Sequence, residues 1–292
     1  MIDAPEAGRV VVIVNEAGEV ALDGRLVVGT VEKIVELREG CICCTVRGDL
    51  ADAVGKLLAR RKECFRPLKF DRLLVECGGL ASPGPVVQTF LLDPTLAAAT
   101  RVDGVVALAS APDLVRQLDD HGEAAEQLAY ADRVVLNHCD RTDDIASAEA
   151  AVRRLNPAAP LDRAVRADVP IAPLFDLRSD DPARWRIADA PPATHTTGVS
   201  HVVLRATTPL DLGRLKLFLQ FIAARRTHNV MRLKGIFHCE GLARGVVAHG
   251  IYQWLELGPG PMAPPTESQL LVIGRGLDRE ELARGWEAVT RG

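Results

Sequence analysis

No apolar run in the sequence approaches the roughly eighteen residues that a membrane-spanning helix needs. The first residues, MIDAPEAG, have neither the basic region nor the apolar region of a secretion signal. A basic stripe is also missing, because the formal net charge of the 292 residues is -4 and charges of both signs are mixed along the chain. Nucleic-acid binding is therefore not expected. These absences favour a cytoplasmic protein that binds neither membrane nor nucleic acid.

The cysteines are unevenly placed along the sequence. There are seven, an odd number, and three of them lie in the tetrapeptide Cys41-Ile42-Cys43-Cys44. Secreted disulfide frameworks use an even number of spread cysteines, so the pattern does not indicate one. Side chains two residues apart in an extended segment point the same way, so Cys41 and Cys43 can face one ion. A turn into the helix predicted from about Arg47 brings Cys44 toward the same ion.

Three clustered thiols favour metal chemistry. The start of a helix lowers the pKa of nearby thiols, and thiolates select soft ions such as zinc or copper(I). A structural zinc site needs four protein ligands, and no second Cys pair or His-x-His pair lies nearby in the sequence, so we expect a site with an open or exchangeable position. The alternatives are that the three are small buried hydrophobes, or that they form a thiol redox site.

The remaining candidate ligands are scattered, and we interpret them as structural. We expect the four isolated cysteines in the hydrophobic core, where free cysteines are common. His195 and His201 are interpreted as solvent-exposed linker and strand residues, with metal binding as the weaker alternative. The four cysteines are Cys64, Cys77, Cys139 and Cys239.

Apolar runs recur along the first part of the chain and alternate with segments of helical spacing. Continuous apolar runs are typical of parallel strands that are covered on both faces. The alternation predicts an α/β fold with a mostly parallel sheet. The predicted strands are residues 9–14, 71–75, 102–109 and 133–136, and the predicted helices between them include residues 49–62 and 111–130.

The composition changes near residues 180–197, which are rich in Asp, Pro, Ala and Thr. Such a segment suits a linker. Strand-like segments and two helices follow, one at residues 211–224 and one from Asp278, which predicts a small α+β domain with an antiparallel sheet. We therefore predict a first domain over residues 1–185, a linker over residues 186–198 and a second domain over residues 199–292.

Three segments, VVIVNEAGEVALDGRLV (residues 11–27), GCICCTVRGDL (residues 40–50) and LLVECGGLASPGPVV (residues 73–87), together resemble the CobW family (CobW/HypB/UreG class) of P-loop GTPases and metallochaperones. The first two segments resemble its second strand, first switch region and metal motif. The third segment resembles its Walker B and second switch segment, with Glu76 and Gly79 in the catalytic positions.

The guanine-recognition motif and the carboxy-terminal domain of the family also have counterparts. ADRVVLNHCD (residues 131–140) lies where the family has Asn-Lys-x-Asp, with Asn137 and Asp140 kept and His138 in place of lysine. RLKGIFHCEG, HGIYQW and LLVIGRGLDREEL resemble the CobW carboxy-terminal domain. The resemblance thus implies a P-loop NTPase-like sheet followed by a small α+β domain.

One family feature is missing from the sequence. A P-loop GTPase holds the nucleotide phosphates with Gly-x-x-x-x-Gly-Lys-[Ser/Thr], and the only Gly-Lys pair, Gly55-Lys56, is followed by Leu57. In the family this loop and its strand precede the strand that is RVVVIV here, so we expect them upstream of Met1 in a complete gene. As written, the chain is expected not to hydrolyse GTP, and GTP with magnesium would bind only if that segment were present.

The resemblance and the cysteine cluster lead to one hypothesis. Cys41, Cys43 and Cys44 bind zinc, with cobalt or iron as alternatives, and the metal passes to a client apoprotein under the control of GTP. The chain alone would keep metal binding without the control by GTP. A non-hydrolysing metal-binding or client-docking module and a thiol redox protein are the rival hypotheses, and homodimer formation stays open.

Overall fold

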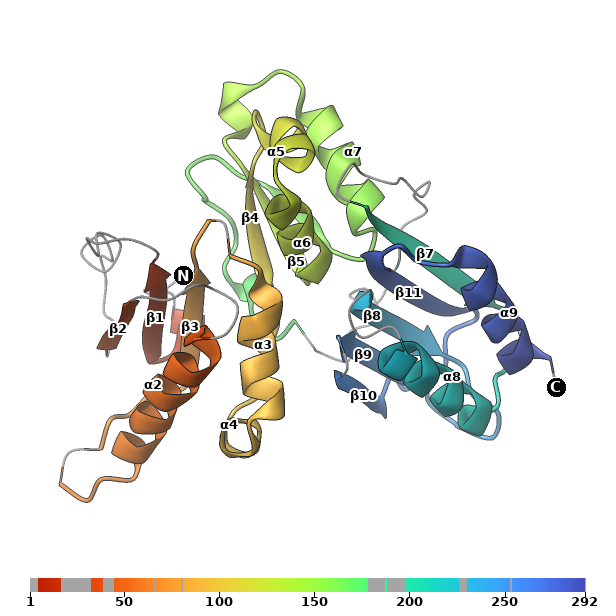
Figure 1. Ribbon diagram of the computed structural model, residues 1–292, viewed down its shortest axis with the longest axis horizontal. Helices are drawn as coiled ribbons and strands as arrows, with labels where there is room; N and C mark the ends of the chain where they lie inside the picture. Colours follow the sequence, from red (N-terminus) through yellow and green to blue (C-terminus); the bar gives the residue numbers. More distant parts are fainter. Residues whose placement is uncertain are drawn as a thin grey trace. The chain divides into compact units, whose positions relative to one another are not determined.

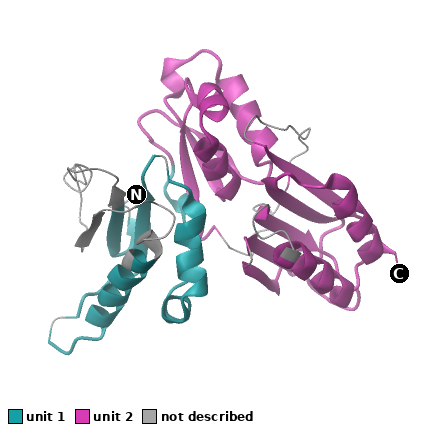
Figure 2. Cartoon of the chain, in the orientation of Figure 1, with its two compact units in different colours: residues 1–103, 170–175 teal, residues 104–169, 176–292 magenta. Residues whose placement is uncertain are grey.

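The computed structural model describes residues 5–16, 33–38, 45–65, 67–79, 81–177, 187, 198–225, 230–252 and 254–291, with the backbone alone for residues 15, 16, 33–38, 45–47, 49 and 225. Contacts group the chain into two compact units, residues 1–103 with 170–175 and residues 104–169 with 176–292 (Figure 2). Each unit has a hydrophobic core of its own. In the described residues, no helix is both long and apolar enough to cross a membrane.

The first unit contains a parallel sheet with strand order β2-β1-β3 (Figure 1). The central strand β1 is apolar from Val10 to Val14, and each of these residues is at most 4% exposed. Both of its faces are covered, since Val11 and Ile13 belong to one core cluster and Val10, Val12 and Val14 to another. The elements are η1 (Pro5–Ala7), β1 (Val10–Glu16), β2 (Lys33–Arg38), α2 (Thr45–Arg61), β3 (Arg72–Cys77), α3 (Pro83–Leu92), α4 (Pro94–Ala99) and η3 (Ala172–Leu174).

The second unit begins with another parallel sheet, of strand order β4-β5-β6. Helices α6 and α7 bury apolar faces that include Leu128 and Val152. Its elements are β4 (Val106–Ser110), α5 (Leu114–Asp120), α6 (Gly122–Tyr130), β5 (Arg133–Asn137), η2 (Cys139–Arg141), α7 (Ile145–Leu155) and β6 (Leu161–Arg163).

The carboxy-terminal part of the second unit is an antiparallel sheet of order β10-β9-β8-β11-β7. Apolar residues of α8 and α9 join one core cluster with residues of the sheet, and Trp286 of α9 lies within it at 5% exposed. The predicted α+β character and antiparallel sheet of this region are confirmed. The elements are β7 (Val199–Ala206), α8 (Leu212–Arg225), β8 (Val230–Phe237), β9 (Val246–Ile251), β10 (Trp254–Pro259), β11 (Ser268–Arg275) and α9 (Arg279–Thr290).

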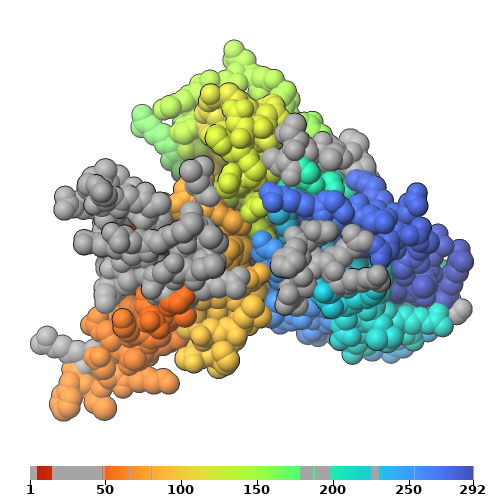
Figure 3. Space-filling view, in the orientation of Figure 1, coloured from red at the N-terminus to blue at the C-terminus, as the bar shows by residue number. Residues whose placement is uncertain are grey.

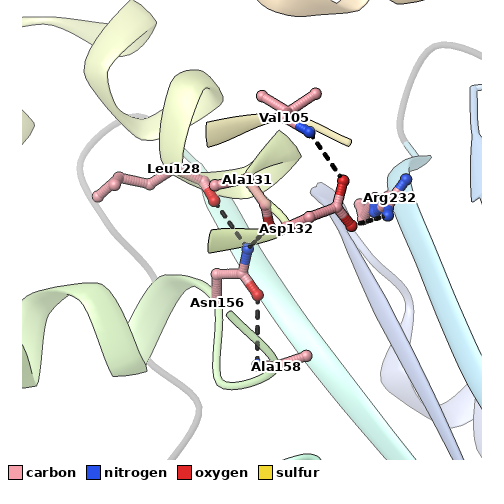
Figure 4. A network of polar contacts seen from close by, with 7 residues as sticks. All are labelled: Val105, Leu128, Ala131, Asp132, Asn156, Ala158 and Arg232. Atoms are coloured by element: carbon pink, nitrogen blue, oxygen red, sulfur yellow. Dashed lines mark hydrogen bonds and ion pairs between the residues drawn. The ribbon is translucent and has the colours of Figure 1, made fainter. Parts of the chain in front are cut away.

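A buried ion pair joins the two sheets of the second unit (Figure 4). Asp132 lies directly before β5, and Arg232 lies on β8; their side chains are 4% and 3% exposed and form an ion pair. The same carboxylate accepts a hydrogen bond from the backbone nitrogen of Val105 at 3.1 Å. Gly104 beside it has no room for a side chain, since an added Cβ would lie 2.8 Å from the Cβ of Leu177. The ion pair therefore ties the start of β4 and β5 to the carboxy-terminal sheet.

Asn156, directly after α7, forms hydrogen bonds with the end of α6 (Figure 4). It is 2% exposed, and its Nδ2 donates to the carbonyl oxygens of Leu128 and Ala131 at 2.8 Å each. Its Oδ1 accepts from the backbone nitrogen of Ala158 at 3.3 Å. The amide therefore holds the end of α6, where the carbonyl oxygen of Leu128 also accepts from the backbone nitrogen of Ala131 at 3.2 Å.

The structure corrects two predicted elements. The single helix predicted over residues 111–130 is two helices, because His121 has extended backbone angles and α6 begins at Gly122. The predicted strand over residues 102–109 begins later, at Val106. The predicted boundaries at residues 185 and 199 stay a prediction, and the compact units divide the chain elsewhere.

Two leucines on neighbouring strands provide a stability test. Leu136 on β5 is fully buried, whereas Leu108 on β4 is 64% exposed. Within the described residues β4 pairs with β5 alone, so it is an edge strand. Leu136→Ala is expected to lower the free energy of unfolding by about 2–5 kcal/mol. Leu108→Ala should change it by less than about 0.5 kcal/mol, measured by urea unfolding. Equal losses for the two variants would contradict the burial difference.

Candidate functional site

The carboxyl ends of β4, β5 and β6 meet at one edge of their parallel sheet, the usual place for ligand binding in open α/β sheets. Ser110 ends β4 and Asn137 ends β5, and the two are register partners. Of the predicted site residues, the structure thus brings Asn137, His138 and Asp140 to this edge, in the order expected from the sequence. All residues of these three strands and of the loops that follow them belong to the described part of the chain.

Asn137 holds neighbouring loops together. It is 8% exposed, and its Oδ1 accepts from the backbone nitrogen of Ala167 at 2.8 Å. Its carbonyl oxygen accepts from the backbone nitrogen of Ala111 at 2.8 Å. Arg166 and Ala167 have φ of +53° and +56°, a left-handed conformation that costs non-glycine residues free energy and is frequent at functional sites. The loop after β6 is therefore held in position by Asn137.

His138 and Asp140 follow at the end of β5. His138 also has left-handed backbone angles, with φ of 58°, and its ring Nδ1 lies 3.2 Å from the Oγ of Ser110. Asp140 lies in η2 and is exposed, so its carboxylate can accept from a ligand. Cys139 between them is half-buried, and its Sγ donates to the carbonyl oxygen of Leu136 at 3.1 Å.

The proposed catalytic positions lie at the end of β3, in the first unit. Glu76 is exposed on the strand, and Cys77 next to it is half-buried. Burial and the neighbouring Glu76 carboxylate raise the pKa of the Cys77 thiol, which keeps it protonated. A Cβ added to Gly79 would meet no heavy atom within 4 Å. Among the residues that the structure describes, none would therefore clash with a side chain at this position.

The metal motif lies outside the described residues. Cys41, Cys43 and Cys44 directly precede α2, which begins at Thr45. Within the described part of the chain, no group of three or more His, Cys, Asp or Glu residues is arranged to hold a metal ion. The cysteine site therefore stays a prediction, and His195 also falls outside the described residues.

Two expectations about isolated residues are wrong. Cys64 is exposed in the segment that follows α2 (orange in Figure 3), and Phe65 beside it is 97% exposed, whereas Cys239 is buried as expected. Burial raises the pKa of the Cys239 thiol to about 11. His201 is 1% exposed rather than open to solvent, and its Nδ1 lies 2.9 Å from the carbonyl oxygen of Arg154. Arg154 is in the last turn of α7, where carbonyl groups lack partners within the helix.

Sequence reasoning missed Ser110 and Ala167. Ser110 could have been found as the polar residue that directly follows the strand predicted over residues 102–109. Ala167 carries no such signal, because its role depends on a backbone nitrogen and on positive φ.

Comparison with known proteins agrees with the fold. The family model "CobW/HypB/UreG, nucleotide-binding domain" matches residues 1–163, and "Cobalamin synthesis protein cobW C-terminal domain" matches residues 199–290. Zinc chaperone CobW of Pseudomonas aeruginosa is 33% identical over 334 residues, covering 97% of this chain and 84% of its own. Zinc chaperone YjiA of Escherichia coli is 29% identical over 252 residues, covering 83% and 77%.

A solved structure also resembles this fold. The crystal structure of a zinc-bound triple mutant of the YjiA GTPase has a TM-score of 0.76 at 22% identity, covering 99% of this chain and 92% of that one. With matches to both family models across most of its length, the chain belongs to the CobW/HypB/UreG family and carries its nucleotide-binding domain and its CobW carboxy-terminal domain.

Proposed function

We propose that this protein is a zinc chaperone that binds its cargo ion through Cys41, Cys43 and Cys44 and delivers it to a client apoprotein. The observation that carries the proposal is the three-cysteine cluster directly before α2 in a chain of this family. Three thiolates suit a soft ion, and an open fourth position allows transfer. The relatives named as zinc chaperones support zinc over cobalt or iron.

We also propose that the edge formed by β4, β5 and β6 is the guanine end of a nucleotide site. The residues present fit a guanine base chemically. The base offers N–H donors, and the exposed Asp140 carboxylate accepts hydrogen bonds. Asn137 fixes the loop that contains Ala167, whose left-handed backbone would be held ready for the ligand. His138, in place of the family lysine, is part of the same edge.

The sequence lacks residues that GTP hydrolysis requires. Glu76 and Gly79 would act at the γ-phosphate and its magnesium ion, but the sequence contains no Gly-x-x-x-x-Gly-Lys-[Ser/Thr] to hold the phosphates. The nucleotide that this chain binds by itself would therefore be held mainly through the nucleoside. In a chain that also carried the phosphate loop, bound GTP would order the segment with the cysteines and so control zinc affinity.

A zinc and nucleotide titration tests the proposal. Purified residues 1–292 should bind about one zinc ion per chain in competition with a chromogenic chelator. The same preparation should show no GTP turnover above the buffer control and no magnesium-dependent gain in affinity for a fluorescent GTP analogue. Absence of zinc binding would overturn the chaperone proposal, and measurable turnover would overturn the account of hydrolysis. A disulfide that forms readily in place of zinc binding would favour the redox alternative.

A further inference from the structure

Four side chains form a continuous hydrogen-bonded chain at the edge formed by β4 and β5. The Oγ of Ser110 donates to Oδ2 of Asp113 at 2.9 Å and lies 3.2 Å from Nδ1 of His138. Nη2 of Arg116 donates to Oδ1 of Asp113 at 3.1 Å. Ser110 thus connects a carboxylate to the imidazole that stands in the lysine position of the family motif.

The direction of the hydrogen bonds fixes the imidazole proton. The hydrogen bond from the Ser110 hydroxyl, with help from Arg116, lowers the pKa of Asp113, so the carboxylate is an acceptor only. A hydroxyl has one proton, and Ser110 uses it in the hydrogen bond to Asp113. The oxygen of Ser110 can therefore only accept from His138, which requires a proton on Nδ1. In the neutral ring, Nε2 then carries the lone pair.

Asp113 accepts hydrogen bonds from Ser110 and Arg116 and does not cap its own helix. It occupies the N-cap position of α5, where aspartate usually accepts a backbone hydrogen bond from the helix. The structure shows no such bond for Asp113. Four other N-cap aspartates in the described residues do accept one, namely Asp93, Asp144, Asp211 and Asp278. The Asp113 side chain is thus placed by Ser110 and Arg116 rather than by its own helix.

The backbone of His138 is also held in an unfavourable conformation. Its φ of 58° and ψ of 33° lie in the left-handed region, which a side chain with a Cβ adopts at a free-energy cost. Strain of this kind persists where the surroundings determine it, often at ligand sites. The imidazole is therefore constrained both through its backbone and through Nδ1.

We propose that Ser110 is a positioning residue that holds His138 in the Nδ1–H tautomer, so that Nε2 serves as a hydrogen-bond acceptor for a donor group of the bound guanine nucleoside. This inference rests on the proposed nucleotide site. A lysine side chain offers donors only, so the histidine reverses the hydrogen-bond polarity at this position. The residue then accepts a hydrogen bond from the nucleoside, which a lysine at this position could not do.

The tautomer is tested by nitrogen NMR of the ¹⁵N-labelled full chain, with His138 assigned by comparison with His138→Gln. The native protein should show a pyrrole-type Nδ1 and a pyridine-type Nε2. Asp113→Ala removes the acceptor, so the Ser110 hydroxyl becomes free to donate to Nδ1, and the Nε2–H tautomer should appear. Ser110→Ala should also release the tautomer, and Ser110→Thr, which keeps a hydroxyl, should restore it.

These variants separate positioning from a general structural role. A folding defect would alter resonances throughout the chain, whereas loss of the tautomer lock changes His138 with the rest of the spectrum preserved. A pyridine-type Nδ1 in the native protein, or an unchanged tautomer in both Asp113→Ala and Ser110→Ala, overturns the positioning role of Ser110.

The ligand is tested with guanosine 5′-monophosphate, which does not depend on a loop for the β and γ phosphates. Its addition should shift the Nε2 resonance together with the backbone amides of residues 137–140. Movement of the amides without Nε2 would overturn the contact to Nε2 while leaving the nucleotide site intact. If no resonance moves, the nucleotide part of the proposed function fails and the ligand of Nε2 with it, whereas the tautomer result is decided independently.

Discussion

Replacing Cys41, Cys43 and Cys44 together by serine is expected to abolish zinc binding, from about one ion per chain to a background level. Serine hydroxyls are not deprotonated at neutral pH and are poor ligands for soft ions, so the whole binding free energy of the cluster is lost. Elemental analysis after dialysis and competition with a chromogenic chelator measure the change.

The chain offers a matched control for this triple variant. Cys64 is exposed and lies apart from the cluster in the sequence, so Cys64→Ser removes an accessible thiol without touching the motif. It should retain full zinc binding. Equal zinc content in the triple variant and in Cys64→Ser would exclude the cluster as the cargo site, and the chaperone proposal would lose its central residues.

Arg232→Ala is expected to lower the free energy of unfolding by about 3–5 kcal/mol, because it leaves the Asp132 carboxylate buried without its ion-pair partner. Urea unfolding monitored by circular dichroism measures the loss. The exposed pair Arg284 and Glu280 provides the control, and Arg284→Ala should leave the unfolding midpoint unchanged.

A double variant separates the cost of a lone charge from the value of the pair. In Asp132→Leu with Arg232→Met neither position of the pair carries a charge, so most of the loss should be recovered. Recovery should be incomplete, because the backbone nitrogen of Val105 loses its acceptor, at a cost of about 1–3 kcal/mol. A double variant less stable than Arg232→Ala would contradict this account of the ion pair.

Of the strands in the two parallel sheets, β1, β3, β4 and β5 were predicted because each has an apolar run in the sequence, whereas β2 and β6 were not. The run from Val10 to Val14 is apolar at every position, as a strand covered on both faces requires, and it forms β1. The helix over residues 111–130 was predicted as one element because its composition suits a helix throughout. The extended backbone of His121 that divides it has no counterpart in apolar periodicity.

The candidate site was predictable only in part. Asn137, His138 and Asp140 could be named because they follow a strand in a family motif, and the structure brings them to one edge. The contribution of Ser110 depends on which atom receives its single proton, and that depends on the position of Asp113 three residues later. His201 was predicted to be solvent-exposed because it follows a linker-like segment, yet it contacts the end of α7 across 47 residues of sequence.

The Asp132–Arg232 pair also limits which carboxy-terminal segments of related proteins could replace the one in this chain. The two residues are 100 positions apart, one within the segment matched by the nucleotide-binding family model and one within the segment matched by the carboxy-terminal model. A chimera that took its carboxy-terminal segment from another protein would need a cation at the position of Arg232, or a neutral residue at Asp132. The two segments are therefore expected to evolve as partners rather than as interchangeable modules.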